Sequence, residues 1–145
     1  MRVLGIDFGT VRVGLALGDT ESRIASPWGV ITESDRLALL SRLHDVMKRD
    51  FVEAVVIGVP RPLKDSSKVN LQVRITKSFI EDVKRFGLPV FEEDEAMSSK
   101  LALQQVTHAS PVERGRKRGA GAIEKRDDLA AASILQTWLD RKSVA

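Results

Sequence analysis

Acidic side chains stand at three points of the sequence where a predicted buried element begins or ends. Asp7 closes the apolar run at residues 3–6, Asp94 and Glu95 follow the apolar pair at 90–91, and Asp127 and Asp128 precede an apolar helical pattern. A carboxylate at the rim of a core is costly to bury unless a positive charge compensates it. Two-metal enzymes hold several carboxylates around cations, which activate water and stabilise the leaving oxygen of a phosphodiester. The acids therefore favour a metal-dependent phosphodiesterase.

The spacing leaves some alternatives open. If the strand at 90–91 lies beside the strand at 3–7 with the same direction, Asp7 and Glu95 project from one sheet edge and the last helix can bring Asp127 to them. Apolar residues follow both Asp127 and Asp128 at helical spacing, so periodicity does not choose between them. A plainer interpretation also stands: acids in a first helical turn favour the helix dipole, and residues 92–95 are typical of a solvated loop.

The composition limits the kind of site. The 145 residues include no cysteine and only two histidines, His44 and His108. This excludes disulfides, thiolate nucleophiles and cysteine-bound zinc, and it leaves little for a histidine-rich metal site. A metal site would use oxygen ligands, which favours Mg²⁺ or Mn²⁺.

Positive charge is concentrated in one segment. Residues 110–126 hold six basic and two acidic residues, and this net charge of +4 exceeds the +3 of the whole chain. We predict a mobile basic loop there that contacts a nucleic-acid backbone. Its candidate phosphate ligands are Arg114, Arg116, Lys117, Arg118 and Lys125.

The hydrophobic pattern predicts a mixed α/β sheet with helices packed on it, in three layers and one domain. Strands are expected near residues 3–7, 11–17, 24–31, 54–57 and 90–91, and helices near 39–47, 69–86, 96–107 and 129–139. The first two strands form a hairpin, Pro27 places the third at an edge, and Thr32 or Ser34 caps the first helix. No apolar run is long enough to suggest a membrane span, and the residues after Arg2 are not typical of a secretory signal, so we expect a cytoplasmic protein.

Four blocks of the sequence resemble the YqgF (RuvX) family over nearly the whole chain. They are Asp7-x-Gly9-x-x-Arg12-x-Gly14-x-Ala16-x-x-Asp19, Gly58-Val59-Pro60, Asp94-Glu95, and Asp127-x-Leu129-Ala130-Ala131 leading to Ile134-Leu135-Gln136. The resemblance implies an RNase H-like fold with a five-stranded sheet and helices on both faces. It also implies a nuclease, since the family is described as Holliday junction resolvases and as nucleases that mature the 5′ end of pre-16S ribosomal RNA. It identifies Asp7, Glu95 and Asp127 as the catalytic, metal-binding acids.

Two blocks depart from the family pattern. The acidic motif usually continues Asp-Glu-Arg-Leu-Thr-Thr, whereas this chain has Ala96-Met97-Ser98-Ser99 after Glu95, and the usual glycine after Pro60 is replaced within residues 63–67. The missing arginine bears on rate and selectivity if that side chain holds phosphate. Arg12 is the basic residue that we expect beside the site, where it holds a phosphate or orients Asp7.

The expected partner is therefore structured RNA, with branched DNA as the alternative substrate and ribosomal particles as further partners. Phosphate contacts carry no sequence information, so specificity would come from substrate shape. A resolvase would be a two-fold dimer, whereas an RNA 5′-end nuclease can work as a monomer. Two other hypotheses remain: a non-catalytic nucleic-acid-binding module, and an ATPase of the sugar-kinase and actin type, which Asp7-Phe8-Gly9-Thr10 resembles but which needs two lobes.

Overall fold

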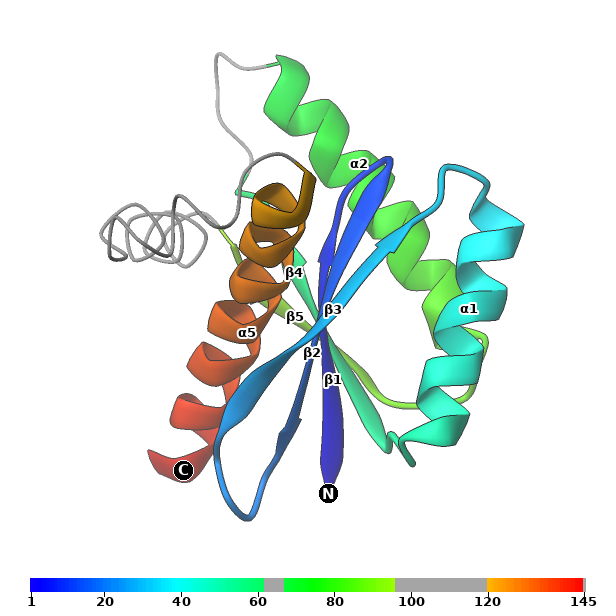
Figure 1. Cartoon of the computed structure of the whole chain (residues 1–145). Coiled ribbons are helices and arrows are strands. Elements are labelled where there is room, and N and C mark those ends of the chain that lie inside the picture. Colours follow the sequence, from blue (N-terminus) through cyan, green and yellow to red (C-terminus); the bar gives the residue numbers. More distant parts are fainter. Residues whose placement is uncertain (62–66, 96–119, 145) are drawn as a thin grey trace.

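A five-stranded mixed sheet lies between two layers of helices (Figure 1) in the computed structural model, which describes residues 1–61, 67–95 and 120–144. In chain order the elements are β1 (Arg2–Phe8), β2 (Arg12–Asp19), β3 (Ala25–Thr32), α1 (Arg36–Arg49), β4 (Ala54–Val59), α2 (Ser67–Lys84), β5 (Val90–Asp94) and α5 (Ala120–Val144). The helix α5 covers one face of the sheet, and α1 and α2 cover the other. The predicted three-layer arrangement is confirmed.

The strand directions bring three carboxyl ends to one edge of the sheet. The strand order is β3-β2-β1-β4-β5, with β2 antiparallel to both of its neighbours and β4 parallel to both β1 and β5. The condition that the strand at 90–91 lies directly beside the first strand is not met, because the fully buried β4 pairs with both. A strand that is apolar throughout suits this central position. The carboxyl ends of β1, β4 and β5 nevertheless share one edge.

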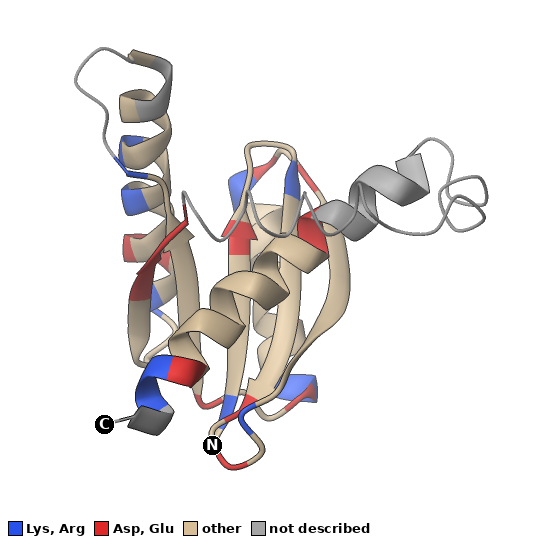
Figure 2. Ribbon diagram, turned by 90° about the vertical axis from the view of Figure 1, so that its left-hand side faces the viewer, with Lys and Arg blue, Asp and Glu red and all other residues tan. Residues whose placement is uncertain are grey.

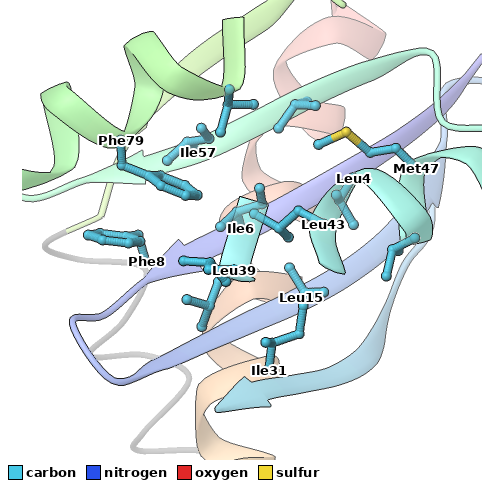
Figure 3. Packing of buried hydrophobic residues seen from close by; sticks show 14 of the residues in the cluster. Leu4, Ile6, Phe8, Leu15, Ile31, Leu39, Leu43, Met47, Ile57 and Phe79 are labelled. Carbon is cyan, nitrogen blue, oxygen red and sulfur yellow. The ribbon is translucent and has the colours of Figure 1, made fainter. Parts of the chain in front are cut away.

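Alternation along β1 divides its residues between two cores. Leu4, Ile6 and Phe8 pack toward α1 and α2, where Phe8 stacks on Phe79 with ring centroids 4.2 Å apart (Figure 3). Val3 packs with the residues of α5 on the opposite face. Because side chains alternate along a strand, Asp7 is on the α5 side, as Val3 is. The first strand thus delivers its carboxylate to the face covered by the last helix.

Small residues allow α5 to pack close to the sheet. A Cβ atom added to Gly5 would lie 2.8 Å from Cβ of Leu135, and one added to Gly18 would lie 3.0 Å from Cδ1 of Leu139. Close packing of this kind fixes the height of the helix above the strands. The position of every α5 side chain relative to Asp7 depends on it.

Several predicted boundaries need correction. The N-cap of α1 is Asp35, whose side chain accepts a hydrogen bond from the backbone N–H of Ala38, rather than Thr32 or Ser34; all three residue types are good caps. The last helix begins at Ala120, so residues 120–126 of the predicted loop are helical, consistent with their alanine and long charged residues. The predicted helix at 96–107 and the loop residues 110–119 lie outside the described residues.

Two further expectations concern the sheet edge and the membrane. β3 is an edge strand, as Pro27 predicts, and its register with β2 shifts between Leu15 and Ala16. Within the described ranges, no helix is long and apolar enough to cross a membrane.

Candidate active site

Two carboxyl groups meet at the carboxyl edge of the sheet on the α5 side. Asp7 is the penultimate residue of β1, and Glu95 directly follows β5, where its N–H donates a 3.1 Å hydrogen bond to the carbonyl of Val59. The two side chains are joined by a hydrogen bond. Such a bond between two carboxyl groups needs a shared proton, because two ionised carboxylates can only accept. The structure therefore brings together two of the three predicted acids.

Glycine in the intervening strand makes this contact possible. β4 lies between β1 and β5, and Gly58 sits near its end. A Cβ atom at Gly58 would lie 3.3 Å from Oε2 of Glu95 and 2.5 Å from Cδ1 of Ile134. The carboxyl group of Glu95 thus occupies the space over β4 that a side chain would otherwise fill.

Asp127 approaches from the helix on the same face. Its Oδ2 lies 3.3 Å from Nε of Arg12, at the start of β2, and its side chain is 29% exposed. The backbone of α5 touches the sheet here, since a Cβ at Gly14 would lie only 2.0 Å from the carbonyl oxygen of Asp127. Gly14 is paired with Asp7 across the hairpin. The register of the first two strands thus places α5 and Asp127 next to Asp7.

The four consecutive acids around the end of β5 have different partners. Glu92 pairs with Lys77 at 2.6 Å, the buried Glu93 pairs with Arg141 of α5, and Asp94 pairs with Arg61 at 3.1 Å. Glu95 instead forms a hydrogen bond with another acid. These residues are largely part of the sheet, so the alternative of a simple solvated loop is wrong for 92–94. The pairing distinguishes Glu95 from the three acids before it, because Glu95 acts on Asp7 of the neighbouring part of the sheet.

Electrostatics at the site strongly disfavour the ionised form of Asp7. Burial is the largest cause of its raised pKa, which lies well above the ordinary 3.8, and the carboxylate of Glu95 and the hydrogen bond with it raise the pKa further. The charge of Asp127 acts in the same direction. A buried acid whose pKa is raised by two neighbouring acids is a typical environment for a bound cation, because a cation would stabilise the ionised forms together.

The donor set suits a hard divalent cation. Asp7, Glu95 and Asp127 offer only carboxylate oxygens, which are the ligands that Mg²⁺ and Mn²⁺ prefer. Within the described residues, no three acid or imidazole side chains converge closely enough to form a ready ligand set. Asp7 and Glu95 are already together, while the carboxylate of Asp127 faces Arg12. The chemistry of the residues therefore fits a cation, which would replace the proton shared by the first two acids.

The other predicted site residues are described less fully. Arg12 lies where the sequence suggested, next to an acid of the site, although its partner is Asp127. Lys125 is on α5, two residues before Asp127. The remaining basic candidates, Arg114, Arg116, Lys117 and Arg118, lie outside the described residues. Figure 2 shows acidic segments on β5, which is the edge strand opposite β3, and at the upper end of α5, both at the same end of the sheet.

The roles of Gly14 and Gly58 were missed in the sequence. Both belong to blocks that suggested the family, but a glycine in a strand indicates only a bulge or a close approach, without naming what approaches. The pair of Glu93 and Arg141 was also missed, because 48 residues separate the two along the chain.

A test of the Gly58 geometry is substitution by alanine. The new methyl group would press on Ile134 and reach the carboxyl group of Glu95, so we expect phosphodiester cleavage by the Gly58→Ala variant to be about tenfold slower. The measurement is the single-turnover rate beside a urea unfolding curve. A variant that cleaves at the parent rate would contradict the idea that Glu95 needs this space.

The chain is similar to known proteins over nearly its whole length. The family model described as "RuvX: Holliday junction resolvase" matches residues 1–141. A relative from Maridesulfovibrio salexigens, named "Putative pre-16S rRNA nuclease", is 37% identical over 142 residues, covering 97% of this chain and 99% of that protein. The similarity therefore extends over all the acids of the candidate site.

Two solved structures with a similar fold are resolvases. The chain matches T. thermophilus RuvC in complex with Holliday junction substrate with a TM-score of 0.64 and 21% identity, covering 99% of this chain and 96% of that one. It matches the yeast mitochondrial Holliday junction resolvase Ydc2 with a TM-score of 0.57 and 14% identity, covering 97% of this chain and 78% of that one. At these identities the likeness concerns the fold alone, which is the expected RNase H-like fold.

Proposed function

This chain belongs to the RuvX family of nucleases, and from that membership we propose that it is a metal-dependent endonuclease that processes the 5′ end of pre-16S ribosomal RNA. The observation that supports this most strongly is the contact between Asp7 and Glu95, with Asp127 close by, at the carboxyl edge of the sheet. A buried acid whose ionised form is disfavoured both by burial and by two neighbouring acids is poorly explained as a structural device.

Asp7, Glu95 and Asp127 would hold the cation. When bound, a divalent cation supplies the positive charge that activates water for attack on phosphorus and stabilises the leaving oxygen. The protein's own contribution is to hold the carboxylates in place: β1 and β5 fix Asp7 and Glu95, and α5 carries Asp127 over Gly14. The guanidinium of Arg12, now beside Asp127, is well placed to contact a substrate phosphate.

RNA is favoured over DNA as the substrate. The relative from M. salexigens covers nearly the whole chain at 37% identity and carries the name of an rRNA nuclease. The resolvase structures are less similar in sequence and support a common fold. Branched DNA is the second candidate, because the family description names Holliday junction resolution. In either case basic residues between 110 and 126 would contact the backbone, and the substrate would be recognised by shape.

An RNA-processing role carries further proposals. The protein would work in the cytoplasm, where ribosomal particles are assembled and could present the RNA end. A single cut at an RNA end can be made by a monomer, whereas symmetric resolution of a four-way junction needs a two-fold dimer.

The decisive experiment compares two labelled substrates, a pre-16S 5′-leader RNA and a four-way DNA junction, in Mn²⁺, Mg²⁺ or EDTA. We expect metal-dependent cleavage of the RNA that is lost in Glu95→Gln and kept in Glu92→Gln, a matched change three residues earlier on β5, because Glu92 pairs with Lys77 instead. Preferential cutting of the junction would select the DNA alternative. Absence of cutting on both substrates, with salt-sensitive binding intact, would favour the non-catalytic module.

A further inference from the structure

A second arginine stands at the same edge of the sheet as the acids. Arg61 follows β4 by two residues, and its side chain is 67% exposed. Its Nε and Nη2 both donate to Oδ2 of Asp94, at 3.3 and 3.1 Å. Asp94 immediately precedes Glu95, so a guanidinium is held one residue along the chain from an acid of the candidate site.

Arg61 and the acids approach this edge from different faces. Asp94 is paired in register with Val59, which belongs to the core under α1 and α2. Asp94 therefore faces the side opposite to Glu95, which reaches over Gly58 toward α5. A nucleic-acid strand with one phosphate at the acids reaches Arg61 only where it crosses this edge.

The ion pair between Arg61 and Asp94 contributes little to the stability of the fold. Both side chains are about two-thirds exposed, and exposed ion pairs of this kind contribute little to stability. Arginine is well suited to phosphate, because its planar fork can donate two parallel hydrogen bonds. Arg12 on the β2 side and Arg61 on the β4 side thus place guanidinium groups on both sides of the acids along this edge, with the partner of Arg61 on the opposite face.

We propose that Arg61 binds a backbone phosphate of the nucleic-acid substrate next to the phosphate that is cleaved, and that Asp94 holds the guanidinium in place until the phosphate displaces it. This assignment rests on the proposed nuclease function and adds a contact outside the metal site. Since the contact is made to the backbone, it contributes affinity and register rather than sequence preference.

The test uses two ion pairs that are similar in charge and exposure. Lys77 of α2 pairs at 2.6 Å with Glu92. Glu92 lies on β5, as Asp94 does, but three residues along the chain from Glu95. We expect Arg61→Ala to bind the labelled pre-16S 5′-leader RNA about fivefold more weakly and to lower the slope of log K against log salt by about 0.7, while Lys77→Ala binds like the parent. Asp94→Asn removes the competing charge, so it is expected to bind a few-fold more tightly, with Glu92→Gln unchanged.

Kinetics add a second readout. The single-turnover rate of Arg61→Ala at saturating RNA should stay near that of the parent while KM rises, because the contact is uniform between ground and transition state. Equal binding by the two alanine variants, or no gain in Asp94→Asn, would overturn the assignment and leave the nuclease function intact. A parent protein that neither binds nor cuts RNA or junction DNA would overturn the nuclease function, and the assignment with it.

Discussion

Alanine at Gly14 is expected to slow phosphodiester cleavage about 100-fold while the chain still folds. The added Cβ would lie 2.0 Å from the carbonyl oxygen of Asp127, 2.4 Å from its carbonyl carbon and 3.0 Å from the backbone nitrogen of Asp128. All three atoms belong to the backbone, so no change of side-chain rotamer relieves the contact. The helix must move, and Asp127 moves with it.

The stability cost of this change is expected to be modest. Overpacking of a well-packed contact typically costs about 1 to 3 kcal/mol, which a domain of this size can tolerate. Single-turnover cleavage and urea unfolding of the same preparation therefore separate the two effects. We expect the loss in rate to be far larger than the loss of folded protein explains.

Gly18 offers a matched control on the same strand and under the same helix. A Cβ there would meet Cδ1 of Leu139 at 3.0 Å and Cδ2 of Leu135 at 3.1 Å, both ends of flexible side chains, beside the carbonyl oxygen of Ile24 at 3.1 Å. Gly18→Ala should destabilise the chain slightly and keep the cleavage rate within a few-fold of the parent. Equal rate losses in the two variants would show that α5 packing as a whole matters, and not the placement of Asp127.

The fold could be predicted from the sequence because its signals are local. The strands expected near 11–17 and 54–57 and the edge position of Pro27 each follow from patterns over a few residues, and the structure confirms them as β2, β4 and the edge strand β3. Strand order was left open: the sequence offered a pairing of β5 with β1 only as a condition, and in the structure β4 lies between them. Parallel neighbours far apart in sequence leave no local signal, and only their shared burial constrains them.

The site shows the same limit. Strand and helix termini mark Asp7, Glu95 and Asp127 as candidates, but periodicity gives Asp127 no advantage over Asp128. In the structure the difference comes from long-range contacts: Asp127 raises the pKa of Asp7 and pairs with Arg12. At the level of sequence, only the family resemblance favoured Asp127 over Asp128.

The contacts that distinguish structural from functional acids also lie beyond local patterns. Glu93 looks like its neighbours in the sequence, yet it is buried and paired with Arg141. Its pKa is raised by burial, an effect that the charge and hydrogen bond of Arg141 oppose. Among the described residues, the charged groups that act on the pKa of Asp7 are Glu95 and Asp127, and both raise it, which indicates that the burial of Asp7 serves something other than stability.

Asparagine at Asp7 is expected to abolish cleavage and, without metal, to make the fold more stable. Because Asp7 is proposed to hold the cation, loss of its carboxylate would remove several kcal/mol of transition-state stabilisation, which corresponds to roughly a thousandfold in rate. The same change removes a buried charge that Glu95 and Asp127 repel, while an amide can still donate a hydrogen bond to Glu95. Function and stability thus make opposite demands on this position.

The pH dependence has a definite sign. Because the pKa of Asp7 is raised in the folded protein, the folded state binds more protons than the unfolded state between the ordinary value of 3.8 and the raised value. Stability of the metal-free parent therefore falls as pH rises through that interval, and the deficit stays constant above it. In EDTA the Asp7→Asn variant should lack this decline, so its advantage is present at neutral pH and disappears below the unfolded value.

Added metal should make the parent more stable than the Asp7→Asn variant, which reverses the order expected in EDTA. A cation that binds only the folded parent stabilises it in proportion to RT ln(1 + [L]/Kd), and the variant gains much less. Urea unfolding in EDTA and in Mn²⁺, from acid to neutral pH, measures both effects, with Asp45→Asn as a control for an exposed carboxylate on α1. A parent that is more stable than Asp7→Asn in EDTA at neutral pH would contradict the electrostatic account. Cleavage by the variant at the parent rate would contradict the assignment of Asp7 to the active site.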